Sequence, residues 1–213
     1  MSRIRENNLG NISYGLDYAD KLTAADRPDD ATDVLKQVMA ADPTSKLAYR
    51  KLANAYDAAN RLSDAAKTYE RLFRLDPRDF RVALKIAEVY LADQDYSSAY
   101  DWADKSLTIS GDGECYGAKG NVYYKAFQDC RSPDISTDDR VVATLAYQLF
   151  NEAEEKGYSR YSRSKEWLKE NGVLFGKPQW FMMDADIKNR GYVKAEGGCY
   201  KWISERLNKE KRW

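Results

Sequence analysis

Apolar and polar residues along the chain follow the spacing of paired helices. In residues 46–79, apolar side chains recur at steps of three and four, which is the period of one helix face. The pattern breaks at residues 60–63, and it breaks again at Asp76-Pro77, because proline disfavours helix in the residue before it. The stretch is therefore predicted to form a hairpin of two amphipathic helices.

The same pattern recurs 34 residues away on both sides of this stretch. Small residues and tyrosines occupy equivalent positions in successive blocks. The members of these series are Ala19, Ala53 and Ala87; Tyr56, Tyr90 and Tyr124; Ala31, Ala65 and Ala99; and Pro43 and Pro77. A fixed period of about 20–50 residues indicates stacked repeats. Hairpins are accordingly predicted at about residues 12–45, 46–79 and 80–113.

A fourth, irregular hairpin is predicted over residues 114–156. An insertion at residues 129–136 interrupts the period, and a capping-box pattern at Ser136 and Asp139 marks the start of the second helix. The predicted repeat domain, residues 1–156, ends here.

Beyond residue 156 the period fades, and a C-terminal extension for capping or docking is predicted over residues 157–213. A short helix is expected at residues 164–171, where Trp167 and Leu168 turn inward. A last amphipathic helix is expected over residues 199–211.

Residues 12–113 resemble tetratricopeptide repeats, a family of 34-residue helix–turn–helix units with large, small and aromatic signature positions and a closing proline. The best-matching unit carries the signature at Tyr49, Leu52, Ala53, Tyr56, Ala65, Tyr69 and Pro77. The resemblance implies an all-α fold, in which antiparallel helical hairpins stack into a right-handed superhelix with an irregular C-terminal cap.

In such arrays the first helix of each pair lines a concave binding surface. The polar residues expected on that surface are Arg50, Lys51, Asn54, Arg81, Lys85 and Lys119. Some family members hold a C-terminal carboxylate in a Lys/Asn/Lys/Arg clamp, and parts of this set resemble its halves. The register fails, because Leu16 and Asp20 stand where the clamp needs Lys and Asn. A cationic groove for an acidic peptide is one hypothesis, and ordinary solvated side chains are the alternative.

The C-terminal extension is rich in aromatic residues. The candidates for docking are Phe175, Trp180, Phe181, Met182, Tyr192 and Trp202. One interpretation is that they pack back onto the fourth hairpin, because a repeat array needs a covered end. The other is that they anchor another subunit, because aromatic residues and Met are enriched at interface cores.

The charge distribution changes the expected partners only slightly. Lys+Arg and Asp+Glu both number 34, and residues 157–213 hold 13 basic against 7 acidic residues. Such a tail could bind an anionic partner or stack head to tail with a second copy, but for so small an imbalance two ordinary solvated surfaces of modest opposite charge are the favoured interpretation. No nucleic acid partner is expected, because the total charge is zero.

Location and redox state follow from two absences in the sequence. No stretch approaches the about 20 apolar residues of a membrane helix, and the N-terminus lacks the apolar region of a signal peptide. Cys115, Cys130 and Cys199 have no C-x-x-C spacing, so reduced thiols are expected. A soluble protein of the cytoplasm, or of a particle assembled inside the cell, is predicted.

No enzymatic function is predicted. The chain has no histidine, which removes the commonest general base and metal ligand. It has no glycine-rich phosphate loop, and Asp184 and Asp186 are ordinary solvated carboxylates rather than a metal pair. No cofactor or metal is therefore expected. The predicted function is an adaptor or scaffold that binds a peptide or protein on the concave face. The alternative is a structural subunit of a larger assembly, a homo-oligomer included, held through the aromatic extension.

Overall fold

The structure is a computed structural model that describes residues 12–211 and 213, and it divides into two compact units. Unit 1 ends at Gln94, and unit 2 begins at Asp95. Residues 1–11, which include the start of the predicted repeat domain and the segment judged to lack a signal peptide, lie outside the described part.

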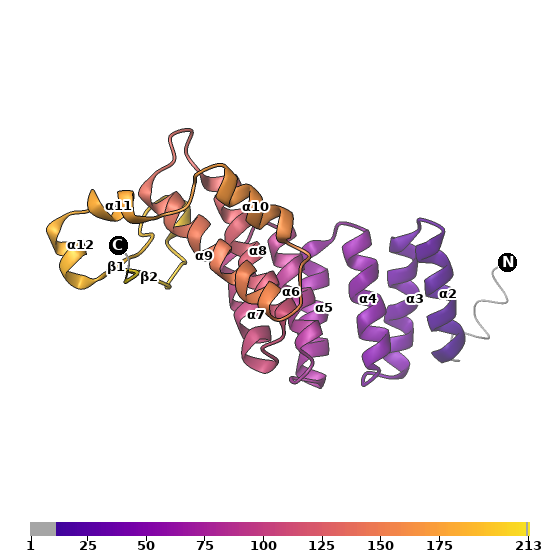
Figure 1. Ribbon diagram of the computed structural model, residues 1–213. Helices are drawn as coiled ribbons and strands as arrows, with labels where there is room; N and C mark the ends of the chain where they lie inside the picture. The colour runs from indigo at the N-terminus through magenta and orange to yellow at the C-terminus, as the bar shows by residue number, and fades with distance from the viewer. Residues whose placement is uncertain (1–11, 212) are drawn as a thin grey trace. The chain divides into compact units, whose positions relative to one another are not determined.

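Unit 1 is a row of α-helices joined by short turns. The helices are α2 (Ile12–Ala24), α3 (Pro28–Ala41), α4 (Lys46–Ala58), α5 (Leu62–Leu75) and α6 (Phe80–Ala92). Each packs on the next, and α2 also contacts α4, the first helix of the following hairpin (Figure 1). Helices α2 and α3 form one hairpin, and α4 and α5 form the next.

Local sequence explains where these helices begin and end. Pro28 occupies the first turn of α3, where its missing N–H is not needed. Asp42 ends α3 directly before Pro43, and Asp76 ends α5 directly before Pro77. Asp79 caps α6, because its side chain accepts hydrogen bonds from the backbone N–H groups of the first turn.

Alanines bring the helices of unit 1 close together. Ala53, Ala65 and Ala87 are buried, and larger side chains such as Tyr69 and Leu72 fill the spaces between the helices. One hairpin alone could not cover these apolar faces, so the row stabilises itself through neighbour contacts.

Unit 2 begins with regular helices and ends in short, irregular elements. The helices are α7 (Tyr96–Ile109), α8 (Gly113–Cys130), α9 (Thr137–Glu155), α10 (Ser162–Glu170), α11 (Lys177–Phe181) and α12 (Ala185–Arg190). A 3-10 turn, η1 (Gly198–Tyr200), and a two-stranded antiparallel pair, β1 (Tyr192–Val193) with β2 (Leu207–Asn208), complete the unit. The capping box of Ser136 and Asp139 at the start of α9 is confirmed.

The predicted last helix over residues 199–211 is wrong. The segment forms η1, then extended chain, then β2. Its apolar residues Tyr200, Ile203 and Leu207 have helical spacing, and they are buried in the core. The backbone is nevertheless not helical, because Leu207 pairs with Val193 in a β-strand.

Glycines of α8 allow a close approach of α9 and of the segment that follows it, in addition to the buried alanines of this hairpin. A Cβ atom on Gly120 would lie 2.9 Å from ring carbons of Phe150, and one on Gly117 would lie 2.8 Å from the ring of Tyr158. Contacts this short require the neighbour to shift, so the tight packing of this hairpin depends on the missing side chains.

A disulfide joins Cys130 at the end of α8 to Cys199 in η1, with 6.0 Å between the Cα atoms. The expectation of three reduced thiols is therefore wrong for this pair, because the folded chain brings together two cysteines that lie 69 residues apart. Cys115 remains a buried free thiol. The predicted cytoplasmic location stays a prediction, and the disulfide weighs against it, because cytosolic reductants keep thiols reduced.

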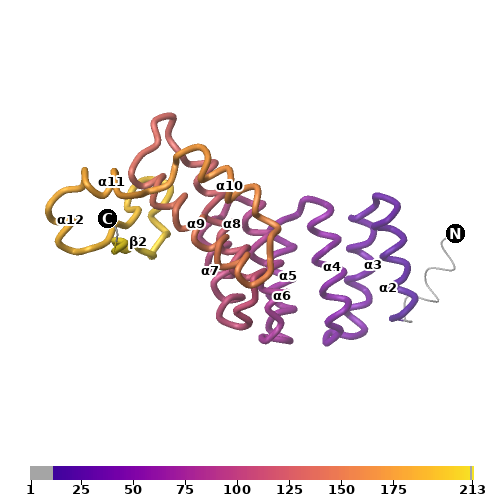
Figure 2. The backbone as a smooth tube through the Cα atoms, viewed as in Figure 1, coloured from indigo at the N-terminus to yellow at the C-terminus, as the bar shows by residue number. Residues whose placement is uncertain are grey.

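The C-terminal extension covers the α8–α9 hairpin. After α11 the backbone turns back through α12 toward β2 (Figure 2). Its buried residues join one core with Phe127 and Phe150; they are Leu168, Val173, Phe175, Trp180, Val193, Ala195, Tyr200, Ile203 and Leu207. The chain is thus an all-α array of helical hairpins with an irregular C-terminal cap.

Candidate functional site

A cavity of about 340 Å³ opens between the first helices of two successive hairpins in unit 1, α2 and α4. Its walls combine small apolar residues with convergent polar groups: Ala19, Asp20, Thr23, Ala24, Leu35, Lys51 and Asn54. We call the surface that α2, α4 and α6 present here the first-helix face. The alanines leave room for another chain to approach closely.

The polar groups of the cavity are held in place by neighbouring side chains. Lys51 Nζ lies 2.5 Å from a carboxylate oxygen of Asp20 on α2. The amide oxygen of Asn54 accepts a hydrogen bond from the hydroxyl of Tyr69 on α5. Burial, together with the negative charge of Asp57, raises the pKa of Tyr69 to about 12, so the hydroxyl remains a donor at neutral pH.

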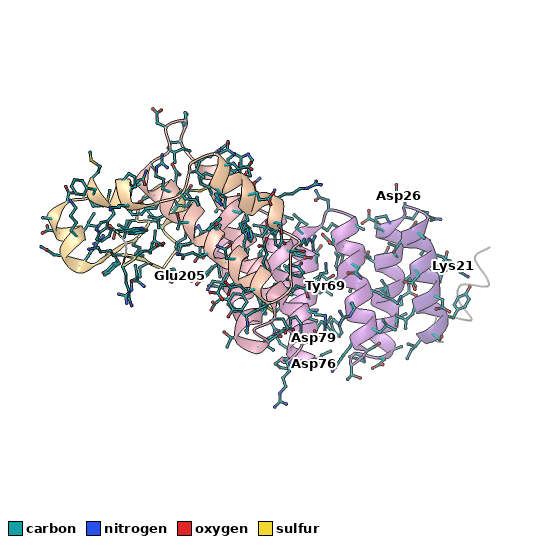
Figure 3. All side chains as sticks on the ribbon, viewed as in Figure 1. Lys21, Asp26, Tyr69, Asp76, Asp79 and Glu205 are labelled. Atoms are coloured by element: carbon teal, nitrogen blue, oxygen red, sulfur yellow. A yellow bond between two sulfur atoms is a disulfide. The ribbon has the colours of Figure 1, made fainter. Side chains whose placement is uncertain are left out.

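The other predicted cations of unit 1 also have local partners. Arg50 lies 3.1 Å from a carboxylate oxygen of Asp79, the cap of α6 (Asp79 is labelled in Figure 3). Lys85 lies 2.5 Å from Glu88, one turn further along the same helix. The guanidinium of Arg81 stacks 4.7 Å from the ring centre of Phe80.

The first-helix face therefore does not belong to a cationic unit. Residues 1–94 contain 15 basic and 15 acidic residues. The acidic surplus of the chain lies in residues 95–156, with 6 basic and 12 acidic residues. The excess basic charge of residues 157–213 thus has its counterpart inside unit 2.

Lys119 lies in unit 2 and is only 8% exposed. Its ammonium is 2.6 Å from Asp104 and 2.9 Å from Glu205 (Figure 3 labels Glu205). Burial alone would lower the pKa of Lys119, but the hydrogen bonds to these carboxylates outweigh it and raise the pKa. The side chain is not open to a partner while these ion pairs hold.

The aromatic candidates of the C-terminal extension fall into two groups. Phe175 and Trp180 are buried, with ring centres 5.6 and 5.9 Å from that of Trp213. Trp202 and Tyr192 are half-buried; Trp202 stacks on Tyr123 at 5.8 Å, and Tyr192 lies under the guanidinium groups of Arg190 and Arg206.

Phe181 and Met182 form the second group. They are 74% and 80% exposed, and they follow one another at the end of α11.

Comparison with known proteins decides the nature of the repeats. Residues 22–84 match a family model described as the tetratricopeptide repeat. Residues 22–84 therefore form tetratricopeptide repeats. Among curated proteins, none matches the sequence.

Several solved structures share the fold. A crystal structure of MamA is 22% identical, with a TM-score of 0.57 over 73% of this chain and 83% of that one. Residues 41 to the end of MamA from Desulfovibrio magneticus RS-1 are 12% identical, with a TM-score of 0.59 over 75% of this chain and 84% of that one. At such identities the likeness concerns the fold. Tetratricopeptide arrays are protein–protein interaction modules, and their extended inner surfaces serve as binding sites.

Sequence reasoning missed the carboxylates that hold the cations of the tetratricopeptide array. Asp20 could have been found as a partner, because it precedes Asn54 by one 34-residue period and so shares its face. Asp79 carries the signal of a helix cap. Glu205 carries no such signal, because it reaches Lys119 from an irregular segment far along the chain.

Two kinds of site are absent from the part of the chain that the structure describes. No three His, Cys, Asp or Glu residues there are grouped so that they could hold a metal ion. No helix there has the length and apolar character needed to cross a bilayer.

Proposed function

We propose that the chain is a non-catalytic adaptor and that unit 1 binds an extended segment of a partner protein on the first-helix face. The observation that carries the proposal is the cavity between α2 and α4, where Lys51, Asp20 and Asn54 converge over small residues. A protein segment has apolar atoms that can pack on the alanines of the cavity. It also has polar groups that can form hydrogen bonds with the polar side chains that line it.

The charges indicate which segments fit best. Lys51 and Asp20 neutralise each other, so the cavity has little net charge while this ion pair holds. A partner carboxylate could replace Asp20 as the acceptor for Lys51, since Asp20 is 56% exposed and can turn toward water. Acidic segments are therefore favoured over basic ones, in keeping with the hypothesis of an acidic peptide.

Site-specific crosslinking tests the proposal. A photoreactive residue at position 54 reports on the first-helix face, and one at position 74 is the matched control, because Arg74 is an exposed residue of α5. In the native source, position 54 should yield a defined protein adduct that position 74 does not. Adducts at position 74 alone, or equal adducts at both positions, would contradict the proposal.

Charge reversal gives a second, quantitative test. Reversing Arg50, Arg81 and Lys85 together should abolish capture of the protein crosslinked at position 54, because the face then repels acidic segments. Unchanged capture would exclude an acidic segment as the ligand. Whether the first-helix face is the binding surface would still be decided by the crosslinking result.

A structural role in a larger assembly is the second candidate function. It is favoured by Phe181 and Met182, since an adjacent exposed Phe and Met are atypical of a solvated surface and typical of an interface core. Light scattering after size exclusion should then give a mass above the 24.4 kDa of one chain. A double substitution to Ser should return the mass to one chain, and a monomer at all concentrations would contradict self-assembly.

A further inference from the structure

The paired strands β1 and β2 of the C-terminal extension have one face in the core and one face outside it. Val193 and Leu207, which pair with each other, are buried. Because successive side chains point to opposite faces of a strand, the neighbours of these two residues lie on the other face. These neighbours are Tyr192, Lys194, Arg206 and Asn208. We call the surface that they form the strand face.

A cavity of about 590 Å³ opens on the strand face. It is lined by Tyr192, Lys194, Ser204, Glu205 and Arg206. Its volume lies within the range of about 300–1,000 Å³ that is usual for ligand sites, and it is about twenty times the volume of one water molecule in the liquid. The cavity therefore has room for several polar groups of a ligand.

Three cations surround this cavity. The guanidinium groups of Arg190 and Arg206 lie 5.0 and 4.9 Å from the ring centre of Tyr192. Lys194 is the third cation, and it follows β1 directly, as Arg206 directly precedes β2. Continuing the register of the strands from Val193 and Leu207 places Lys194 opposite Arg206. Like charges directly opposite each other destabilise a strand pair, so the chain bears an unfavourable interaction here that a bound anion would relieve.

The two carboxylates nearest to these cations do not neutralise them. Glu196 is 65% exposed, and it lies 4.0 Å from Arg190, at the outer limit of an ion pair. Glu205 lines the cavity, but its carboxylate is directed to other partners. It lies 2.9 Å from the ammonium of Lys119 on α8, and it accepts a hydrogen bond from Tyr100 on α7.

Lys194 and Arg206 form no ion pair with any other residue in the part of the chain that the structure describes. The acidic residues of 95–156 balance the charge of unit 2 in number, yet none of them pairs with these two cations. The strand face is thus positively charged, and its natural complement is an anionic ligand.

We propose that the strand face binds an acidic segment of a partner protein, namely a run of Asp or Glu residues. Its carboxylates form ion pairs with Lys194, Arg206 and Arg190, which are spread over both strands and so suit several charges in a row. The two guanidinium groups are held beside the ring of Tyr192, and each can bind both oxygens of a carboxylate. The proposal goes beyond the proposed function and does not depend on it, because the first-helix face belongs to unit 1.

A nucleic acid is the less suitable anion. Single-stranded nucleic acids bind largely by stacking their bases on aromatic rings. The ring of Tyr192 already carries two guanidinium groups, which a base would have to displace.

A titration of the full chain tests the class of ligand. The probe is N-acetyl-hexaglutamate amide, and the neutral control is the corresponding hexaglutamine peptide, which has nearly the same shape. In nitrogen-15 NMR spectra, the glutamate peptide should shift the amide signals of Tyr192, Lys194 and Asn208 in a saturable way. The glutamine peptide should bind at least about tenfold more weakly. Equal binding of both peptides, or no saturable shift, would overturn the proposal. Tighter binding of an oligothymidylate of similar charge would also overturn it, because the site would then be one for phosphates.

Charge-removing variants test the assigned contacts. Lys194→Gln and Arg206→Gln should each weaken binding of the glutamate peptide by about threefold or more, the scale of a partly exposed ion pair. The matched control is Lys169→Gln, which removes the same charge from an exposed residue of α10 and should leave binding unchanged. Equal losses in all three variants would show that the peptide responds only to net charge, and they would overturn the site.

The ligand-free chain gives an independent measurement. Lys194→Gln should raise the melting temperature of unit 2 by about 1–2 °C, because it removes the like charge opposite Arg206. A lowered melting temperature together with unchanged peptide binding would show that Lys194 has a structural role, and it would overturn this contact.

Discussion

Units 1 and 2 build helical hairpins from the same repeat in different ways. In unit 1, alanines set the distance between helices, and every helix contacts the next in sequence. In unit 2, glycines set the distance between α8 and α9, and a disulfide and a long C-terminal extension complete the core. A regular repeat stabilises itself through neighbours, whereas an end unit needs partners from elsewhere in the chain.

One repeat position is occupied by lysine in both units, but the ion pairs of these lysines differ. Lys51, Lys85 and Lys119 are spaced by 34 residues. The first two form ion pairs on the surface of unit 1, with Asp20 and Glu88. The third is buried in unit 2, where it holds Glu205 of the C-terminal extension. A position that forms surface ion pairs in the regular array thus anchors the C-terminal extension in unit 2.

The tryptophans make the two units separately measurable. All five, at positions 102, 167, 180, 202 and 213, lie in unit 2. Tryptophan fluorescence therefore follows the unfolding of unit 2, while amide hydrogen exchange at residues 12–94 follows unit 1.

Removing the disulfide should produce the largest difference between the stabilities of the two units. Replacing Cys130 and Cys199 by Ser should lower the free energy of unfolding of unit 2 by about 4 kcal/mol, because the bond closes a loop of 69 residues. Fluorescence-detected denaturation should show the loss, and exchange in residues 12–94 should not change. A reductant should reproduce the effect in the wild type, and an unchanged midpoint would contradict the bond.

The sequence predicted unit 1 well because its signals are local. The Asp-Pro pairs at Asp42 and Asp76 end helices by backbone sterics, and the 34-residue period places the hairpins without knowledge of distant contacts. The first-helix residues were found in the same way. Their carboxylate partners were missed, although the 34-residue period places Asp20 on the same face and the cap pattern marks Asp79.

The extension of unit 2 could not be predicted by the same means. Tyr200, Ile203 and Leu207 read as a helix face, but their conformation depends on β1 and on Cys130, which are remote in sequence. The burial of Lys119 likewise depends on Glu205. Long-range contacts decide these features, and periodicity carries no information about them.

Replacing the lysine at the same repeat position should affect the stability of the two units very differently. Lys119→Met should destabilise unit 2 by about 2 kcal/mol, since it leaves the half-buried carboxylate of Glu205 without its cation. Lys85→Met should change the stability of unit 1 by less than about 0.5 kcal/mol, because Lys85 is 52% exposed. Denaturation curves followed by fluorescence and by exchange give the two values, and equal effects would contradict the distinction.

Exchanging the small residues tests how each unit sets its helix distances. Gly120→Ala should destabilise unit 2 by about 2 kcal/mol, because its Cβ would meet Phe150 and Leu149 at 2.9 and 3.1 Å. Ala53→Gly should destabilise unit 1 by about 1 kcal/mol through the lower helix propensity of glycine. A stabilising Gly120→Ala would mean that α8 and α9 can move apart freely.

Acid should affect unit 2 through Asp139, which links the start of α9 to the extension. Its side chain accepts hydrogen bonds from Tyr200 at 2.7 Å and from the backbone of Ser136 at 2.9 Å. Burial would raise the pKa of Asp139, but these hydrogen bonds outweigh it and lower the pKa. The stabilisation is therefore complete above the unfolded pKa of about 3.9 and is lost as the pH falls through the lower folded value.

Asp139→Asn should remove about 1.5 kcal/mol from unit 2 at neutral pH, since the charge-assisted hydrogen bond from Tyr200 becomes a neutral one. The variant should also lose less stability than the wild type between pH 5 and about pH 2, although Glu154 and Glu205, whose pKa values are also lowered, continue to contribute. Fluorescence-detected denaturation at each pH measures both effects. Parallel pH profiles for variant and wild type would show that the carboxylate of Asp139 is not what joins the extension to α9.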